Sequence, residues 1–286
     1  MTDILVIGSI NLDLSASIAR LPGPGETVTG AKLSRFPGGK GANQALAARR
    51  LGADVRLIAC AGDDAFADEA LALLREGGVD LSGLQRLEGE ATGIALIAVS
   101  AAGENQIVVA PGANAMMPAD NLDLGKADAL ICQLEIPGNV IARAAEQFDG
   151  FFCANLAPAR EIDVTILQRA DLVVVNETEA AWYGEALSAC QGMIATTYGS
   201  RGAALQDNGR LVAEAAPPEV NAIDTVGAGD TFTAALTLAL VEGQSPEDAL
   251  NFACAAGAAA TTRAGAQPSL PTRAEVLALL PGLQVE

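Results

Sequence analysis

Short apolar runs that alternate with helical patterns constrain the fold of this chain more than any other feature. Six such runs are expected to be buried strands: Ile4–Ile7, Val55–Ala59, Ala129–Leu134, Phe151–Asn155, Leu172–Asn176 and Met193–Thr197. Helical patterns lie between and after them, at about 42–51, 65–76, 138–147, 163–168, 228–242, 246–262 and 273–280. This alternation predicts a mostly parallel sheet with helices on both faces and ligand sites at the carboxyl ends of its strands.

Two stretches break this rhythm. Leu14–Leu33 resembles a strand pair interrupted by Leu-Pro-Gly-Pro-Gly, and Thr92–Pro111 contains two alternating strands around the turn Ala102-Gly-Glu-Asn105. We expect both to pair as a small separate sheet, whose bare face would cover a site or a second subunit. A hairpin is expected at Leu205–Ala213. With 286 residues, the whole is predicted to be one α/β domain.

Composition excludes several classes of function. The chain has no His, which removes Ser-His-Asp and Cys-His catalysis and the common His-containing metal sites. Its five Cys residues show no CxxC spacing and lie mostly in apolar stretches, so buried reduced thiols are expected. A net charge of −18 makes nucleic acids and anionic membranes poor partners. We see no signal peptide or membrane span in the sequence and expect a cytoplasmic protein.

The segment Asp224-Thr-Val-Gly-Ala-Gly-Asp-Thr-Phe232 has the strongest chemical signal. Its glycines precede an apolar helix, so the backbone N–H groups of residues 227 to 230 can converge on an anion at the positive end of that helix. Asp230 stands at the mouth of this pocket, where a base beside an anion hole suits phosphoryl transfer to a hydroxyl. A tight turn followed by an exposed first-turn acid would explain the same residues.

Four further segments place polar residues where predicted strands end or helices begin. Gly8–Asp13 carries two polar side chains on one face of a strand, and Pro37–Gln44 combines three glycines with hydroxyl-binding donors. Asn176–Glu179 suits either the water shell of Mg²⁺ or a capped helix start. Thr197–Gly202 suits a nucleotide but could be only a loop, and neither a Walker A loop nor a GxGxxG motif is present.

These segments, in this order, resemble the ribokinase branch of the PfkB carbohydrate kinase family. Asp224–Phe232 matches the DTxGAGDxF signature of the family, and Gly38–Gly52 resembles its amino-terminal glycine signature. Further similar segments are Gly8–Asp13, Asn155–Arg160, Asn176–Ala180 and Arg263–Ser269. The resemblance implies a ribokinase-like three-layer α/β/α sandwich with a small β-sheet lid from insertions at about 12–35 and 92–112. It also implies a homodimer that forms through these lids.

The resemblance further implies ATP-dependent phosphorylation of D-ribose at O5, with Asp230 as base and Gly227, Ala228 and Gly229 forming the anion hole. The sugar would be held by Asn11, Asp13, Gly39, Lys40, Gly41, Asn43 and Glu135. ATP would contact Asn176, Thr197, Gly199, Ser200, Arg201, Gly202, Gly229 and Cys254. Glu179 would help to organise Mg²⁺ through water, and K⁺ would bind Asp224, Val226, Ala260, Arg263, Gly265 and Ser269.

Two departures from the family pattern stand out. Only twenty residues separate Asn176 from Thr197, so a helix there is expected to be shortened or lost. Cys254 replaces a polar residue that ribokinases commonly carry near the adenine, which affects the expected nucleotide preference. The alternatives are a related kinase for deoxyribose, fructose or adenosine, and a sugar-binding protein without catalysis.

Overall fold

The structure is a computed structural model that describes residues 1–102 and 104–280. Within these residues the strands form a nine-stranded sheet, in the order β13-β12-β11-β10-β9-β8-β1-β4-β5, and a separate four-stranded sheet. Seven neighbouring strands of the large sheet are parallel, and two at one edge are antiparallel. Its members are β1 (Asp3–Ile7), β4 (Asp54–Gly62), β5 (Asp80–Leu87), β8 (Ala129–Gln133), β9 (Phe151–Asn155), β10 (Leu172–Asn176), β11 (Met193–Thr197), β12 (Ala203–Asp207) and β13 (Arg210–Ala215).

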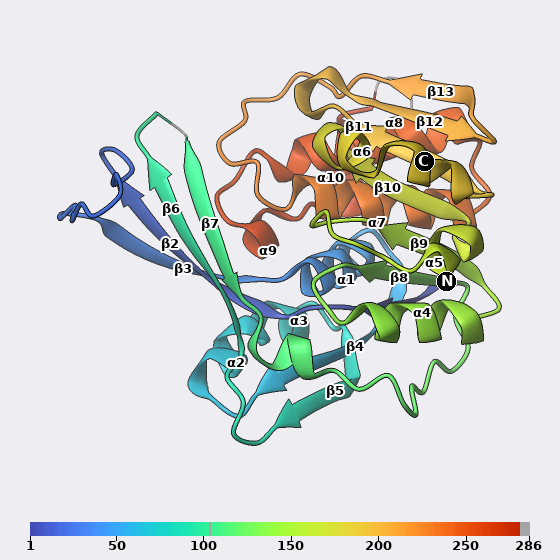
Figure 1. The fold of residues 1–286 in the computed structure, drawn as a ribbon. Helices are drawn as coiled ribbons and strands as arrows, with labels where there is room; N and C mark the ends of the chain where they lie inside the picture. The colour runs from blue at the N-terminus through green and yellow to red at the C-terminus, as the bar shows by residue number, and fades with distance from the viewer. Residues whose placement is uncertain (103, 281–286) are drawn as a thin grey trace.

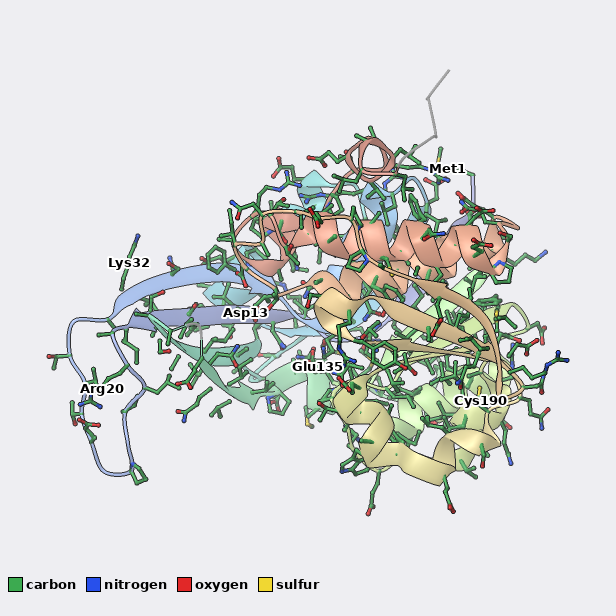
Figure 2. The ribbon with its side chains drawn as sticks, turned by 90° about the horizontal axis from the view of Figure 1, so that it is seen from above. Met1, Asp13, Arg20, Lys32, Glu135 and Cys190 are labelled. Carbon is green, nitrogen blue, oxygen red and sulfur yellow. The ribbon has the colours of Figure 1, made fainter. Side chains whose placement is uncertain are left out.

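Helices cover both faces of this sheet, as the alternation predicted. One layer contains α1, α7 and α8, and the other contains α4 and α5 (Figures 1 and 2). The helices are α1 (Lys40–Arg50), α2 (Ala65–Ala70), α3 (Ala72–Glu76), α4 (Gly138–Gln147), α5 (Val164–Arg169), α6 (Glu177–Tyr183), α7 (Ala228–Val241), α8 (Pro246–Ala260), α9 (Ala266–Ser269) and α10 (Arg273–Ala278). The described residues also contain three 3₁₀ turns, η1 (Gly112–Met116), η2 (Gly184–Ala189) and η3 (Gly199–Arg201).

The core lies between these layers. The central strands β1 and β8 are buried along almost their whole length, because a parallel strand between two helical layers has no wet face. Alanine fills much of the buried surface of α7 and α8, which lets these two helices pack closely. All five Cys residues are buried free thiols, which confirms the prediction for them. No helix among the described residues has the length and apolar character needed to cross a membrane.

The two irregular stretches form the small sheet, in the order β3-β2-β6-β7. The strands β2 and β6 pair in parallel, so the two insertions join in the middle of this sheet and their own hairpins form its edges. The sheet projects from the body like a lid (Figure 1), and we call it the lid below. It consists of β2 (Asn11–Ile18), β3 (Lys32–Gly38), β6 (Gly93–Ser100) and β7 (Asn105–Ala110). Gly103, in the turn predicted between β6 and β7, lies outside the described residues.

Two local features differ from the sequence prediction, and a third agrees with it. The edge strand β5 was not predicted, because its sequence Asp-Leu-Ser-Gly-Leu-Gln-Arg-Leu has no continuous apolar run. Four of its eight residues are exposed and the other four are only half-buried. The single helix expected over 65–76 is two short helices that meet at Leu71. The expectation of a shortened 177–196 connection is confirmed, since one short helix and a 3₁₀ turn occupy it.

Candidate active site

The carboxyl ends of the central strands meet the beginnings of α1 and α7, and polar side chains gather there. Lys40 is the first residue of α1, and Asp230 lies in the first turn of α7. Gly39 precedes α1 with a φ of 90°, and a Cβ on it would lie 2.7 Å from the backbone nitrogen of Asn11. The start of α1 is therefore pressed against the connection between β1 and β2, which only a glycine permits.

Asp230 is buried and held by two side-chain amides of α1. The Nδ2 atom of Asn43 donates to its Oδ2 at 2.8 Å, and the Nε2 atom of Gln44 donates to its Oδ1 at 2.9 Å. The Oδ1 atom of Asn43 is buried and has no partner among the described residues. The carboxylate of Asp230 is therefore an oriented base, and the Oδ1 atom of Asn43 beside it is a free acceptor. A compound with hydroxyl groups could bind to both.

Glu135 forms a second polar centre beside α1. Its Oε2 atom accepts hydrogen bonds from the Ser9 hydroxyl at 2.5 Å, from the Lys40 backbone N–H at 3.1 Å and from Asn11 Nδ2 at 3.5 Å. Asn114 in turn donates from its Nδ2 atom to Asn11 Oδ1 at 2.8 Å. These contacts fix the side chains at the start of the lid relative to the carboxyl end of β8.

Four carboxylates act on the charge of Lys40: Asp13, Glu135, Glu179 and Asp230. Burial lowers the pKa of the Lys40 ammonium, but the attraction of these carboxylates outweighs burial and the pKa is raised overall. Lys40 is consequently a permanent cation at neutral pH. Its positive charge offsets part of the repulsion among the four carboxylates.

Asp13 is the acid that this arrangement perturbs most clearly. Burial, together with repulsion from Glu135 and Asp230, raises its pKa from 3.8 to about 7, although the nearby Lys40 acts to lower it. Figure 2 shows Asp13 on the lid and Glu135 in the body, while Arg20 and Lys32 lie at the far end of the lid. The carboxylates of Asp13 and Glu135 thus lie where the lid joins the body.

The loop before α7 has the geometry of an anion site. Gly227 caps the helix with a φ of 83°, in the left-handed region that favours glycine. Among the described residues, the N–H groups of Gly227, Gly229 and Asp230 have no acceptor, whereas the Ala228 N–H donates to the Thr225 carbonyl at 3.3 Å. Three free amides at a helix N-terminus would bind an anion.

The residues expected at the nucleotide lie on the neighbouring strand ends. Asn176 and Glu179 form a complete capping box at the start of α6, so the helix-start interpretation of this tetrapeptide is confirmed. Burial raises the pKa of Glu179 despite the hydrogen bond from the Asn176 N–H and the nearby Lys40. The next strand end leads into η3, where Arg201 pairs with Glu177 at 2.6 Å. Thr197, Gly199, Ser200 and Gly202 lie in or beside this turn.

Cys254 occupies a covered position on α8. Its thiol donates to the Ala215 carbonyl at 3.7 Å, and burial raises its pKa to about 11. A buried neutral thiol is a small apolar group with a weak donor, so this side chain offers little to a polar ligand.

The residues just before α7, 224–227, and those that follow α8, 261–269, form a separate oxygen-rich loop region. The Asp224 carboxylate accepts from the Val226 N–H at 3.0 Å and from the Gly265 N–H at 2.9 Å, which ties the anion loop to the end of α8. The carbonyl oxygens of Val226 and Arg263 accept no hydrogen bond from a backbone N–H group among the described residues. Free carbonyls beside a carboxylate provide the hard oxygen donors that alkali and alkaline-earth cations prefer.

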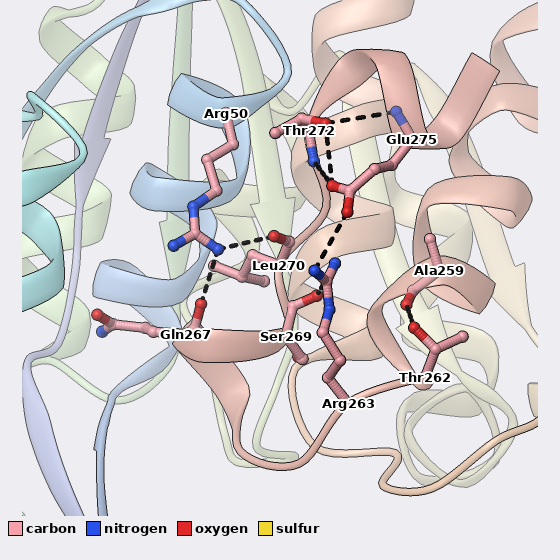
Figure 3. A network of polar contacts seen from close by, with 9 residues as sticks. All are labelled: Arg50, Ala259, Thr262, Arg263, Gln267, Ser269, Leu270, Thr272 and Glu275. Carbon is pink, nitrogen blue, oxygen red and sulfur yellow. Dashed lines mark hydrogen bonds and ion pairs between the residues drawn. The ribbon is translucent and has the colours of Figure 1, made fainter. Parts of the chain in front are cut away.

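Arginine side chains hold this loop region from outside. Arg50 of α1 donates to the Gln267 carbonyl at 2.9 Å and to the Leu270 carbonyl at 2.7 Å. Arg263 donates to the Ser269 carbonyl at 3.3 Å and pairs with Glu275 of α10 at 3.1 Å (Figure 3). The position of the oxygen-rich loop is therefore set by α1 and α10.

Several polar residues of the site had no role in the sequence prediction. Gln44, Gln133 and Asn155 form a buried amide chain behind Asp230. Ser9 and Asn114 hold Glu135 and Asn11, respectively. The available signal was position, since Asn155 ends a predicted apolar strand and Gln133 is the last residue but one of another. Polar residues at the carboxyl ends of parallel strands therefore indicate a ligand site, as glycine motifs do.

This combination of fold and site defines a class of protein. Residues 1–273 match the pfkB family of carbohydrate kinases, and the chain belongs to that family. A ribokinase from Bacillus subtilis is 37% identical over 98% of this chain and 100% of its own length. The structure of Arabidopsis thaliana ribokinase complexed with ribose and ATP matches with a TM-score of 0.89, 30% identity and 98% and 99% coverage. A Salmonella typhi deoxyribokinase is 32% identical over 94% of this chain and 96% of its own length.

Proposed function

We propose that this protein transfers the γ-phosphoryl group of ATP to O5 of D-ribose. The observation that carries the proposal is the position of Asp230, a buried and oriented carboxylate beside three free amides at the start of α7. Relatives named ribokinase that align over almost the whole chain support the choice of ribose.

In the proposed mechanism, the polar set at the base of the lid binds the sugar hydroxyls. Asn43 offers a free Oδ1 atom, Asp13 and Glu135 offer acceptors, and Lys40 balances their charge. The remaining sugar contacts that we propose are Asn11, Gly39 and Gly41. Asp230 accepts the proton of the O5 hydroxyl as this oxygen attacks the γ-phosphorus.

The amides of residues 227 to 230 stabilise the charge that builds up on the transferring phosphoryl group. In this proposal the Ala228 N–H exchanges its 3.3 Å bond to Thr225 for the phosphoryl oxygen. ATP lies across the strand ends that follow, in contact with Asn176, Thr197, Gly199, Ser200, Arg201, Gly202, Gly229 and Cys254. The buried thiol of Cys254 indicates apolar packing rather than hydrogen bonding at its end of the nucleotide.

We also propose sites for two cations. Mg²⁺ binds mainly phosphate oxygens and water and needs few protein carboxylates, which fits the single carboxyl of Glu179 on this side of Lys40. K⁺ would take the carboxylate of Asp224, the Ser269 hydroxyl and the carbonyls of Val226, Ala260, Arg263 and Gly265. When bound, these cations would neutralise phosphate charge and fix the anion loop, respectively.

We propose further that residues 1–286 act as one catalytic domain in a cytoplasmic homodimer. The lid supports the dimer, because it exposes large apolar side chains that a monomer rarely leaves in water: Leu33, Leu96, Ile107, Val108 and Val109. The register places Asp13, Ala95 and Val109 side by side on one face, and Ile107 follows two residues further on. A partner on this face would therefore lie close to the sugar.

A coupled assay of ADP release tests the function. The purified protein is assayed with ATP, Mg²⁺ and K⁺ and with ribose, deoxyribose, fructose, adenosine or no sugar. Turnover with ribose at the highest kcat/KM is expected, because buried partners for several hydroxyls reject analogues that lack one. A higher kcat/KM with deoxyribose would give the chain the activity in the name of its Salmonella typhi relative. Inactivity with every acceptor would favour a binding protein.

The Asp230→Asn variant tests the mechanism separately. It should fold and bind ribose, and its kcat should fall by about 10²–10⁴ because the base is lost. Wild-type kcat in this variant would remove Asp230 from the mechanism.

A further inference from the structure

We infer that Gln44 is a positioning residue for the catalytic base, and that it anchors Asp230 to the central sheet through a chain of buried amides. This inference rests on the proposed function, which makes Asp230 the base. Gln44 and Gln133 are completely buried, and Asn155 is 6% exposed. These three residues therefore act from behind the site, without reaching the solvent from which substrates arrive.

The hydrogen bonds of Gln44 define its orientation completely. Its Nε2 atom donates one hydrogen to Asp230 Oδ1 at 2.9 Å and the other to Asn155 Oδ1 at 3.0 Å. Its Oε1 atom accepts from Gln133 Nε2 at 2.6 Å. A reversed amide would point its oxygen at two acceptors and its NH₂ at a donor, so the three bonds hold only in this arrangement.

The far ends of the chain are fixed in the sheet. Asn155 donates from Nδ2 to the Val174 carbonyl of β10 at 3.1 Å, which commits its Oδ1 atom to the role of acceptor. Gln133 ends β8, and Asn155 ends β9. Three neighbouring strands therefore determine where Oδ1 of Asp230 lies, although Asp230 itself belongs to a helix.

Asn43 cannot provide the same anchor. Its Nδ2 atom makes one bond to Asp230 Oδ2, and its Oδ1 atom has no partner among the described residues. Rotation of Asn43 breaks one hydrogen bond, whereas rotation of Gln44 breaks three. The two oxygens of Asp230 thus differ, with Oδ1 held by the sheet and Oδ2 on the side that we assign to the sugar.

The test compares Gln44→Leu with wild type in the ADP-release assay. We expect kcat to fall about 10- to 100-fold, because misplacement of a catalytic group by about 1 Å can cost a factor of 10². The KM for ribose should stay within about threefold, since Gln44 lies behind the carboxylate. Gln44→Glu places a like charge against Asp230, so the acidic limb of its kcat–pH profile should move upward by about one pH unit or more.

Thr237→Val is the matched control. Thr237 is completely buried on the same helix as Asp230, and its hydroxyl donates to the Thr233 carbonyl at 2.8 Å. Its loss should lower the melting temperature without changing kcat or the pH profile. If kcat falls equally in Gln44→Leu and Thr237→Val, or not at all in Gln44→Leu, the inference is wrong.

Two further measurements cover the remaining cases. If Gln44→Leu does not fold, Gln44→Asn retains the amide but withdraws it from Asp230, and wild-type kcat in this variant overturns the inference. If wild type prefers an acceptor other than ribose, only the proposed substrate fails and the comparison uses that acceptor. If wild type turns over no acceptor, carboxyl ¹³C NMR of Asp230 replaces kinetics, and the same titration midpoint in wild type and Gln44→Leu overturns the inference.

Discussion

Asp13→Asn is expected to stabilise the sugar-free protein while weakening its use of ribose. The carboxyl of Asp13 is 7% exposed, and its pKa is raised from 3.8 to about 7 by burial and by repulsion from Glu135 and Asp230. At about 1.4 kcal/mol for each tenfold change in proton affinity, this rise corresponds to about 4 kcal/mol of folding free energy. The asparagine side chain has nearly the same shape and carries no charge.

The sign of the effect depends on pH in a defined way. Below about pH 4, both the folded and the unfolded states hold the proton, and the charge of Asp13 costs nothing. Between the unfolded value of 3.8 and the folded value of about 7, the unfolded state ionises first, so wild-type stability falls as the pH rises. Above about pH 7 the full cost remains. The stability gap between Asp13→Asn and wild type should therefore grow across this window and then level off.

Thermal unfolding without ligands between pH 4.5 and 8 measures this gap. Allowing for relaxation around the charge, we expect about 2–4 kcal/mol at pH 8, which raises the melting temperature by at least about 4 °C in a domain of this size. The exposed Asp120→Asn variant is the control and should show no such growth. A gap that does not change with pH, or an Asp13→Asn protein that is less stable at pH 8, would refute the reasoning.

Three other predictions concern substrates, cation and assembly. The KM for ribose should rise about fivefold between pH 7 and pH 6 if ionised Asp13 accepts the sugar hydroxyls, and a flat KM would remove Asp13 from the sugar site. Replacement of K⁺ by Na⁺ should lower kcat in wild type but not in Asp224→Ala, whose kcat should already be low; an equal response in both proteins would move the cation elsewhere. Ile107→Lys, on the exposed face of the lid, should convert the proposed dimer to a monomer in sedimentation at constant melting temperature, and an unchanged dimer mass would place the interface elsewhere.

Much of the fold follows from the sequence because the signals are local. The strand at Leu172–Asn176 was predicted to the residue, since an unbroken apolar run buried on both faces ends at a polar residue. The helix that begins after Ser245 was also predicted from its local sequence, which has a capping hydroxyl and a proline in the first turn. Strand β5 could not be predicted in this way, because its place at the sheet edge comes from pairing with β4 and not from its own pattern.

The residues of the site also fall into those that local sequence predicts and those that only the folded arrangement brings together. Asp230, Lys40 and the glycines beside them belong to motifs in which a few adjacent residues are enough to predict the chemistry. Gln44 stands inside one of these motifs, yet its role depends on residues 89 and 111 positions away in the chain, Gln133 and Asn155. Such a network exists only after the strands have been placed side by side. Motif reasoning therefore finds the groups that touch a ligand more readily than the groups that hold them in position.

The charge of the protein raises a last point about how the site can work. A net charge of −18 repels ATP, and four carboxylates lie around the place where we expect the sugar and the γ-phosphate to meet. Attraction over long distances therefore cannot bring the nucleotide to this site. Binding must come from contacts at short range, namely the free amides of the anion loop, Lys40 and bound cations. In the proposed mechanism each of these acids has a use: Asp230 takes a proton, Asp13 and Glu135 bind hydroxyls, and Glu179 helps to hold Mg²⁺. The high pKa of Asp13 is then a cost of the empty site that the bound sugar offsets.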